Sequence, residues 1–110
     1  MTVETTLSAL ADDTRRGTVE ALGRGPLTAG QLAARLDITP AALTGHLRVL
    51  RRAKLVAVAL DPEDTRRHVY SIEQAPFDEL GEWVRATTDF WTNQLGSFVA
   101  HSKGTTGAKR

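Results

Sequence analysis

The sequence predicts a mainly α-helical fold with one small β-hairpin, and three patterns lead to this prediction. Leucines at helical spacing form two short runs that meet within residues 28–54. Two runs of β-compatible residues flank a proline-containing turn within residues 55–72. A longer apolar run at helical spacing begins at residue 75 or 76. We therefore expect a winged helix-turn-helix of about five helices that dimerises through its terminal helices.

Residues 28–54 are the most informative stretch, because each of its two predicted helices has one apolar face. Thr39 can accept a hydrogen bond from the free backbone N–H groups of the second helix, and Pro40 suits its first turn, where no N–H is needed. We expect Thr28 to cap the first helix in the same way and to present its N-terminus to a phosphate. The apolar positions are Leu32, Ala33 and Leu36 in the first helix and Leu43, Leu47 and Leu50 in the second.

The opposite face of the second helix carries small residues near its start and cations farther along. Residues 38–54 contain four Lys or Arg and no Asp or Glu. Small groups let a helix enter a DNA groove, and the cations can contact phosphates or bases. The alternative is a solvated basic face, which is typical of charge runs. Thr44 is the predicted base reader, Arg48 is predicted to contact a base or a phosphate, and Arg51, Arg52 and Lys54 are predicted to hold phosphates. The outward positions are Ala41, Thr44, Gly45, Arg48 and Arg52.

The predicted hairpin carries two arginines next to its turn. The turn is Asp61-Pro62-Glu63-Asp64, between strand-like runs at residues 55–60 and 69–72. Arg66 and Arg67 lie where the tip of a wing would reach the DNA backbone or a minor groove, whose negative potential attracts arginine. The neighbouring acids could instead hold both arginines in surface ion pairs, so both interpretations stay open.

The terminal predicted helix is more broadly apolar than a single domain of this size needs, which favours a partner helix. The alternative is that its apolar residues all pack on the core of their own chain. We predict one domain over residues 1–102 and a disordered tail over residues 103–110. A small organic effector between the distal helices, lined by Trp83, Phe90 and Trp91, is a further hypothesis. The predicted homodimer interface comprises Leu7, Leu10, Trp83, Val84, Phe90, Trp91, Leu95 and Phe98.

Four motifs in order resemble those of the ArsR family of small bacterial winged-helix repressors. They are LADDTRR at residues 10–16, GPLT at 25–28 with Leu32-Ala33, TGHLRVL at 44–50 and AKLV at 53–56. The late Phe90-Trp91 pair is similar to that of a metal-independent branch, and the resemblance covers about residues 7–99. It implies a homodimeric repressor whose second motif helix docks in the major groove. The groove-facing set that it implies is Thr39, Pro40, Ala41, Thr44, Gly45, His46 and Arg48.

The chain departs from this family in two respects. Gly45 stands where the family usually has a long polar residue, and glycine inside a helix costs roughly 0.5 to 1 kcal/mol relative to alanine. Metal-sensing members bind soft metals through cysteines on the first motif helix, whereas this chain has no cysteine. A thiolate metal site and a thiol redox switch are therefore excluded. A second metal pattern of the family needs paired histidines on the last helix, which here has only His101, so we expect no metal and no cofactor.

Charge and composition narrow the class of function. The net charge is +1, but residues 73–100 hold one cation and five acids, so DNA is expected at one face of the molecule only. The sequence has neither a membrane-length apolar run nor a secretory signal, and we expect a cytoplasmic location. It also lacks a glycine-rich phosphate loop and a credible catalytic constellation, so we expect no enzyme. The predicted function is a sequence-specific DNA-binding transcriptional regulator that occupies an inverted repeat. The alternative is a winged-helix module that binds an acidic protein partner.

Overall fold

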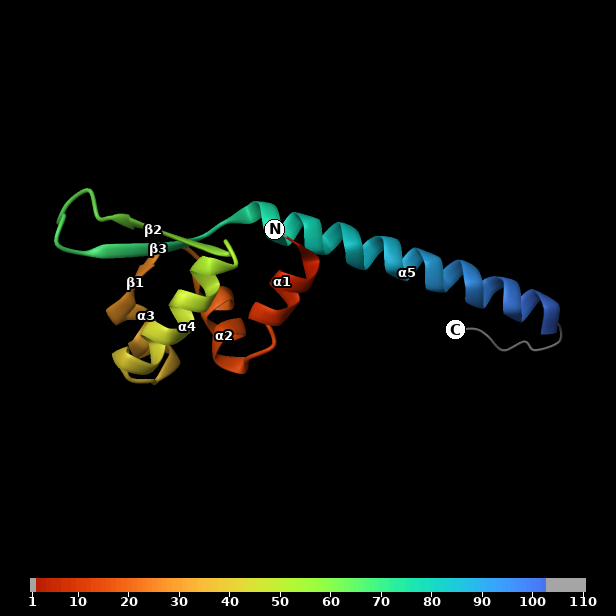
Figure 1. The fold of residues 1–110 in the computed structure, drawn as a ribbon, viewed down its shortest axis with the longest axis horizontal. Coiled ribbons are helices and arrows are strands. Elements are labelled where there is room, and N and C mark those ends of the chain that lie inside the picture. The colour runs from red at the N-terminus through yellow and green to blue at the C-terminus, as the bar shows by residue number, and fades with distance from the viewer. Residues whose placement is uncertain (1, 103–110) are drawn as a thin grey trace. The chain divides into compact units, whose positions relative to one another are not determined.

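The computed structural model describes residues 2–102, with side chains to residue 96. The predicted tail at 103–110 and the Phe98 side chain lie outside this described part. No helix within it is both long enough and apolar enough to span a membrane. Within it, the order of elements is α1 (Val3–Ala9), α2 (Asp13–Leu22), β1 (Leu27–Thr28), α3 (Ala29–Leu36), α4 (Pro40–Arg52), β2 (Val56–Leu60), β3 (His68–Ile72) and α5 (Gln74–Ser102) (Figure 1).

The sheet is an antiparallel hairpin with a short third strand on one side, in the order β1-β3-β2. In the hairpin, Val56 pairs with Ile72 and Leu60 pairs with His68, which confirms the predicted wing. The third strand, β1, was not predicted, because two residues are too short to show an alternating pattern. Leu27 pairs with Tyr70 of β3, so the chain enters α3 directly from the sheet.

The core forms where α2, α3 and α4 pack together on one side of the sheet (Figure 1). The predicted leucine faces of α3 and α4 account for most of its large side chains, and Leu32, Leu43 and Leu50 are completely buried. Burying one such side chain contributes about 1.5–3 kcal/mol, so the two motif helices are held mainly by their apolar faces. Leu55 and Val56 extend the core under the start of the hairpin.

The molecule divides into two compact units, and the boundary between them, after Glu79, falls within helix α5. In the first unit, Pro76 is buried and Phe77 packs against the core. In the second unit, the helix is described by itself, and five of its large apolar side chains are exposed to between 46% (Trp83) and 62% (Leu95).

Candidate nucleic-acid interface

Local hydrogen bonds fix where the two motif helices begin. The Thr39 hydroxyl oxygen accepts a hydrogen bond from the Ala42 N–H at 3.1 Å, and Pro40 occupies the first turn of α4, as predicted. Thr28 and Gln31 form a reciprocal capping box at the start of α3, with distances of 2.9 and 3.1 Å. Asp37 ends α3 in the left-handed conformation, with φ of 56°, which makes the connection to α4 tight.

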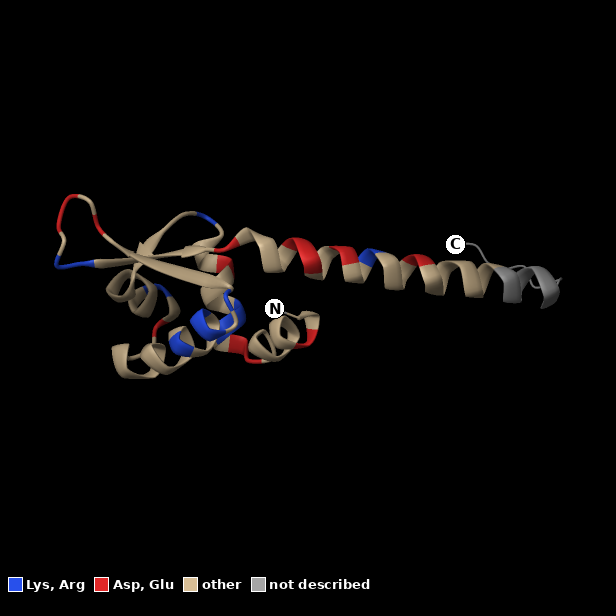
Figure 2. Ribbon diagram, turned by 45° about the horizontal axis from the view of Figure 1, so that its top comes forward, with Lys and Arg blue, Asp and Glu red and all other residues tan. Residues whose placement is uncertain are grey.

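The outward face of α4 is polar and cationic. Its buried leucines leave Ala41, Thr44, Arg48 and Arg52 exposed on the other side, as the periodicity predicted. The Thr44 hydroxyl donates a hydrogen bond to the Pro40 carbonyl oxygen at 2.9 Å, which leaves its oxygen free to accept. Among the side chains that the structure describes, none of the cations Arg48, Arg51, Arg52 and Lys54 is paired with a carboxylate. Figure 2 shows these cations gathered towards the end of α4.

A groove of about 610 Å³ joins this helix to the start of α3 and to the wing. It brings together three residues that the sequence assigned to DNA, Thr28, Arg51 and Arg67. Its wall also includes Gly30, His68 and Tyr70, which the sequence did not suggest as candidates. Gly30, His68 and Tyr70 lie close in the sequence to the predicted residues Thr28 and Arg67. The sequence did not place them in one groove, because that depends on the pairing of β1 with β3.

The two wing arginines form the surface ion pairs that the sequence allowed. Arg66 binds the Asp64 carboxylate through two hydrogen bonds, from Nε at 3.0 Å and Nη2 at 3.2 Å. The Arg66 side chain donates to Asp64 and thereby lowers the pKa of this carboxyl. Arg67 Nε lies 3.8 Å from Asp61 Oδ2. Exposed pairs of this kind contribute little to stability, so exchanging a carboxylate for a phosphate changes the free energy little.

Two predicted groove residues are placed differently from the rest. The His46 imidazole turns towards α2, with Nδ1 3.6 Å from Asp12 Oδ2, and only 26% of the side chain is exposed. A helix residue two positions after Thr44 points to a different side, and the groove-facing role that the family resemblance implied for His46 stays a prediction. A Cβ added at Gly45 would meet no atom within 4 Å, so packing within this chain does not require the glycine.

The predicted dimer residues also divide into two groups. Leu7 on α1 is 43% exposed. Leu10 directly follows α1 and packs partly against the core of its own chain, and its predicted place in the dimer interface stays a prediction. The others with described side chains are exposed, namely Trp83, Val84, Phe90, Trp91 and Leu95.

Comparisons with known proteins agree with this geometry. Residues 10–59 match the model of a helix-turn-helix domain. The chain is 42% identical, over 83% of its length and 79% of the relative's, to the HTH-type transcriptional regulator Rv2034 of Mycobacterium tuberculosis (strain ATCC 25618 / H37Rv). It is also similar to a solved ArsR family transcriptional regulator, with 27% identity, a TM-score of 0.70 and coverage of 81% of this chain and 89% of that one.

A second solved structure, of a possible transcriptional regulator for arsenical resistance, is 34% identical with a TM-score of 0.63. The similarity covers 86% of this chain and 93% of that one. The first two relatives are named as regulators of transcription and the third as a possible one, which confirms the predicted class of function and places the chain in a family that is not one of enzymes. The sequence relatives, the matching domain and the winged fold together show that this chain belongs to the ArsR family of winged helix-turn-helix transcriptional regulators.

Proposed function

We propose that this protein is a homodimeric repressor that binds an inverted-repeat DNA operator through α4. The observation that carries the proposal is the outward face of α4, where Arg48, Arg51, Arg52 and Lys54 have no carboxylate partner among the described side chains. Cations that are not already paired bind phosphate and release its counterions without first breaking a contact in the protein.

The start of α4 suits entry into the major groove. Ala41 and Thr44 are small and exposed, and they precede the first cation, Arg48. The major groove is about 12 Å wide and admits an α-helix. Thr44 would therefore lie near base edges, and Arg48 would contact a base or a phosphate one turn farther along.

The groove beside α4 supplies the backbone contacts. Ala29 and Gly30, whose N–H groups are not used by the capping box, line the same groove as Arg51 and Arg67. A helix N-terminus favours an anion, so one phosphate between α3 and the wing would meet positive charge on three sides.

Exposed apolar residues on α5 support the dimer. Trp83, Val84, Phe90, Trp91 and Leu95 expose a large apolar surface on one helix, which a second copy of the chain would cover. Two copies related by a two-fold axis would place their α4 helices one helical turn of DNA apart, ~34 Å, or a multiple of it. A dimer that covers such a site excludes polymerase, which is why we assign repression.

The signal to which the repressor responds is not a soft metal bound by thiolates, because the chain has no cysteine. Among the side chains that the structure describes, no three potential metal ligands converge. The predicted small organic effector at Trp83, Phe90 and Trp91 stays a prediction.

Selection of bound fragments from random DNA duplexes tests the proposal. We expect enrichment of two related half-sites in inverted order at a fixed spacing. The matched control is retention on a random acidic polypeptide, titrated with the same salt series. Equal retention on both polyanions, with no enriched sequence, would refute the proposal and favour a module that binds an acidic protein.

A further inference from the structure

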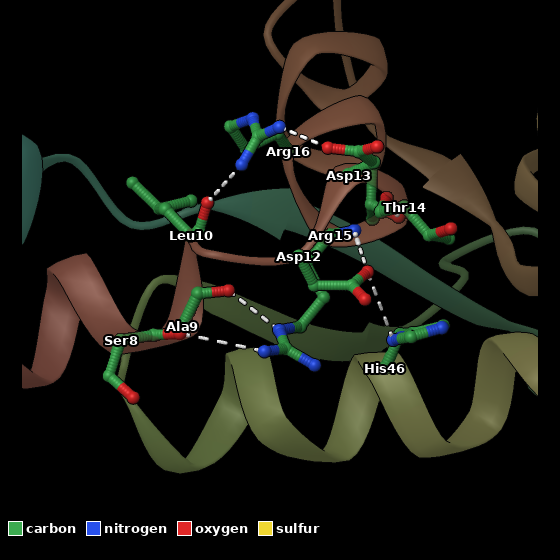
Figure 3. Close-up of polar contacts among 10 residues, drawn as sticks. Ser8, Ala9, Leu10, Asp12, Asp13, Thr14, Arg15, Arg16 and His46 are labelled. Atoms are coloured by element: carbon green, nitrogen blue, oxygen red, sulfur yellow. Dashed lines mark hydrogen bonds and ion pairs between the residues drawn. The ribbon is translucent and has the colours of Figure 1, made fainter.

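The turn between α1 and α2 connects three helices through polar contacts (Figure 3). Asp12 caps α2, because its Oδ2 atom accepts a hydrogen bond from the Arg15 backbone N–H at 3.0 Å. The same oxygen lies 3.6 Å from Nδ1 of His46, which is on α4. The Asp12 carboxylate therefore contacts two helices, α2 and α4, that are far apart in the sequence.

Arg15 and Arg16 fix this turn from the other side (Figure 3). Arg15 Nε donates a hydrogen bond to the Ala9 carbonyl oxygen at 2.6 Å, and Arg16 Nη1 donates to that of Leu10 at 2.8 Å. These carbonyls end α1, where they lack partners inside the helix and where positive charge is favourable. The turn is thus held against α1 as well as against α2.

The contact with His46 lies on the flank of α4, between its buried and outward faces. Leu43, Leu47 and Leu50 hold the helix on the core, but apolar packing has little directional preference. The attraction between the Asp12 carboxylate and a protonated His46 imidazole acts at one point on the flank, 3.6 Å apart, and opposes a rotation of the helix that would separate the two groups. An α-helix with its side chains is about 10–12 Å across, so a rotation of about 10° moves an outward atom by about 1 Å.

A displacement of this size matters for base recognition, since hydrogen bonds weaken steeply with poor geometry. It matters less for attraction to phosphates, which varies slowly with distance. We propose that Asp12 is a positioning residue for DNA reading: its carboxylate, held by the Arg15 backbone, sets the rotation of α4 through His46. The inference rests on the proposed function and assigns a role to the LADDTRR motif, which lies outside the DNA surface.

The charge state of Asp12 agrees with this role. The hydrogen bond from the Arg15 backbone lowers the pKa of the Asp12 carboxyl, and the charges of His46 and Arg15 lower it further. The Asp12 carboxyl that lies beside the His46 imidazole is therefore ionised at neutral pH.

Asp12→Asn and Asp13→Asn form a matched pair of variants that tests the inference. Asparagine caps a helix as well as aspartate does, so the start of α2 is kept while the charge facing His46 is lost. Asp13→Asn makes the same charge change one residue away, on a side chain that is 93% exposed and contacts Arg16. The measurement is the ratio of affinities for a selected duplex and for a scrambled duplex of the same length.

We expect Asp12→Asn to lower this ratio about fivefold relative to Asp13→Asn, which is in the range for residues in direct contact. His46→Gln should lower the ratio by a similar factor, and the double variant should be no worse than either single one. A loss of folded protein would reduce both affinities equally and leave the ratio unchanged, so the measurement separates positioning from stability.

Equal ratios for Asp12→Asn and Asp13→Asn would overturn the inference and leave the proposed function intact. Independent, multiplying losses for Asp12→Asn and His46→Gln would also overturn it. If the wild-type protein prefers no duplex from the random pool, the proposed function itself fails, and the inference fails with it.

Discussion

Arginines occur on both parts of the proposed DNA surface, α4 and the wing, but their contacts with carboxylates differ. On α4, Arg48 and Arg51 are exposed and have no carboxylate partner among the described side chains. On the wing, Arg66 is held by two hydrogen bonds to Asp64, and Arg67 lies beside Asp61. Figure 2 shows the contrast, with acids and bases side by side on the wing and bases alone towards the end of α4.

Because of this difference, the number of arginines on a surface does not measure its affinity for DNA. A phosphate that approaches α4 gains the full attraction of each cation, whereas one that approaches the wing must compete with a carboxylate and is repelled by it. We therefore expect α4 to supply most of the affinity and the wing to add little.

The largest loss of DNA affinity should come from dissociation of the dimer, because a monomer has only one α4. Trp91→Ala removes an exposed aromatic ring from the proposed interface and should weaken dimerisation by about 2 kcal/mol, or about 30-fold. Light scattering across a concentration series measures the change, with Thr92→Ala on the same helix as the control. An unchanged mass at every concentration would show that the dimer interface lies elsewhere.

Arg48→Ala compares the two parts of the surface directly. It should cost about 1–3 kcal/mol in affinity for a selected duplex, because Arg48 has no carboxylate partner among the described side chains and lies one turn beyond Thr44. Arg66→Ala should cost less, since Asp64 already neutralises this arginine. Fluorescence anisotropy at fixed salt measures both, with Arg24→Ala in the turn after α2 as a charge-matched control. A larger loss for Arg66→Ala than for Arg48→Ala would reverse the comparison.

The salt dependence of binding sharpens the comparison further. Each phosphate contact contributes about 0.9 to the slope of log K against log salt, so Arg51→Ala should reduce the slope by about 1. Arg67→Ala should reduce it by less, because Asp61 lies beside this arginine. Titrations of the same duplex at several salt concentrations give the slopes. If Arg51→Ala and Arg67→Ala reduced the slope equally, Arg67 would have to separate completely from Asp61 when DNA binds.

The smallest effect concerns the wing pair itself in acid. The pKa of Asp64 in the folded protein lies below its ordinary value of 3.8, because Arg66 donates to it. Its stabilising contribution is therefore complete above pH 3.8 and is lost as the pH falls through the folded pKa. The small stability advantage of wild type over Asp64→Asn at pH 7, measured by urea unfolding, should disappear in acid. Glu63→Gln, which removes a charge from an exposed neighbour on the same turn, is the control.

The sequence predicted those parts of the fold that depend on local chemistry. The caps at Thr28 and Thr39 need only the hydroxyl and the next three residues. The leucine faces of α3 and α4 follow from helical geometry alone. The two-residue strand β1 could not be predicted, since it exists only through its pairing with β3.

The candidate site was predictable to the extent that one helix face defines it. The outward residues of α4 follow from its period, but the position of His46 depends on Asp12, which approaches from another helix. The partial packing of Leu10 on the core of its own chain was not predictable either, because a short helix has too few turns to tell its core side from its open side. For the wing arginines the sequence left two interpretations; the structure shows the ion pairs with Asp64 and Asp61, and contact with DNA stays a prediction.

Thr28 belongs to two elements at once, because it ends β1 and caps α3. Inserting or deleting a residue beside it would break the strand register and the helix cap together, so this junction has a fixed length. The wing tip at residues 61–67 has no such double role, and surface loops of this kind accept extra residues at small entropic expense. Relatives of this protein can therefore be expected to vary the reach of the wing while leaving the entrance to the reading motif unaltered.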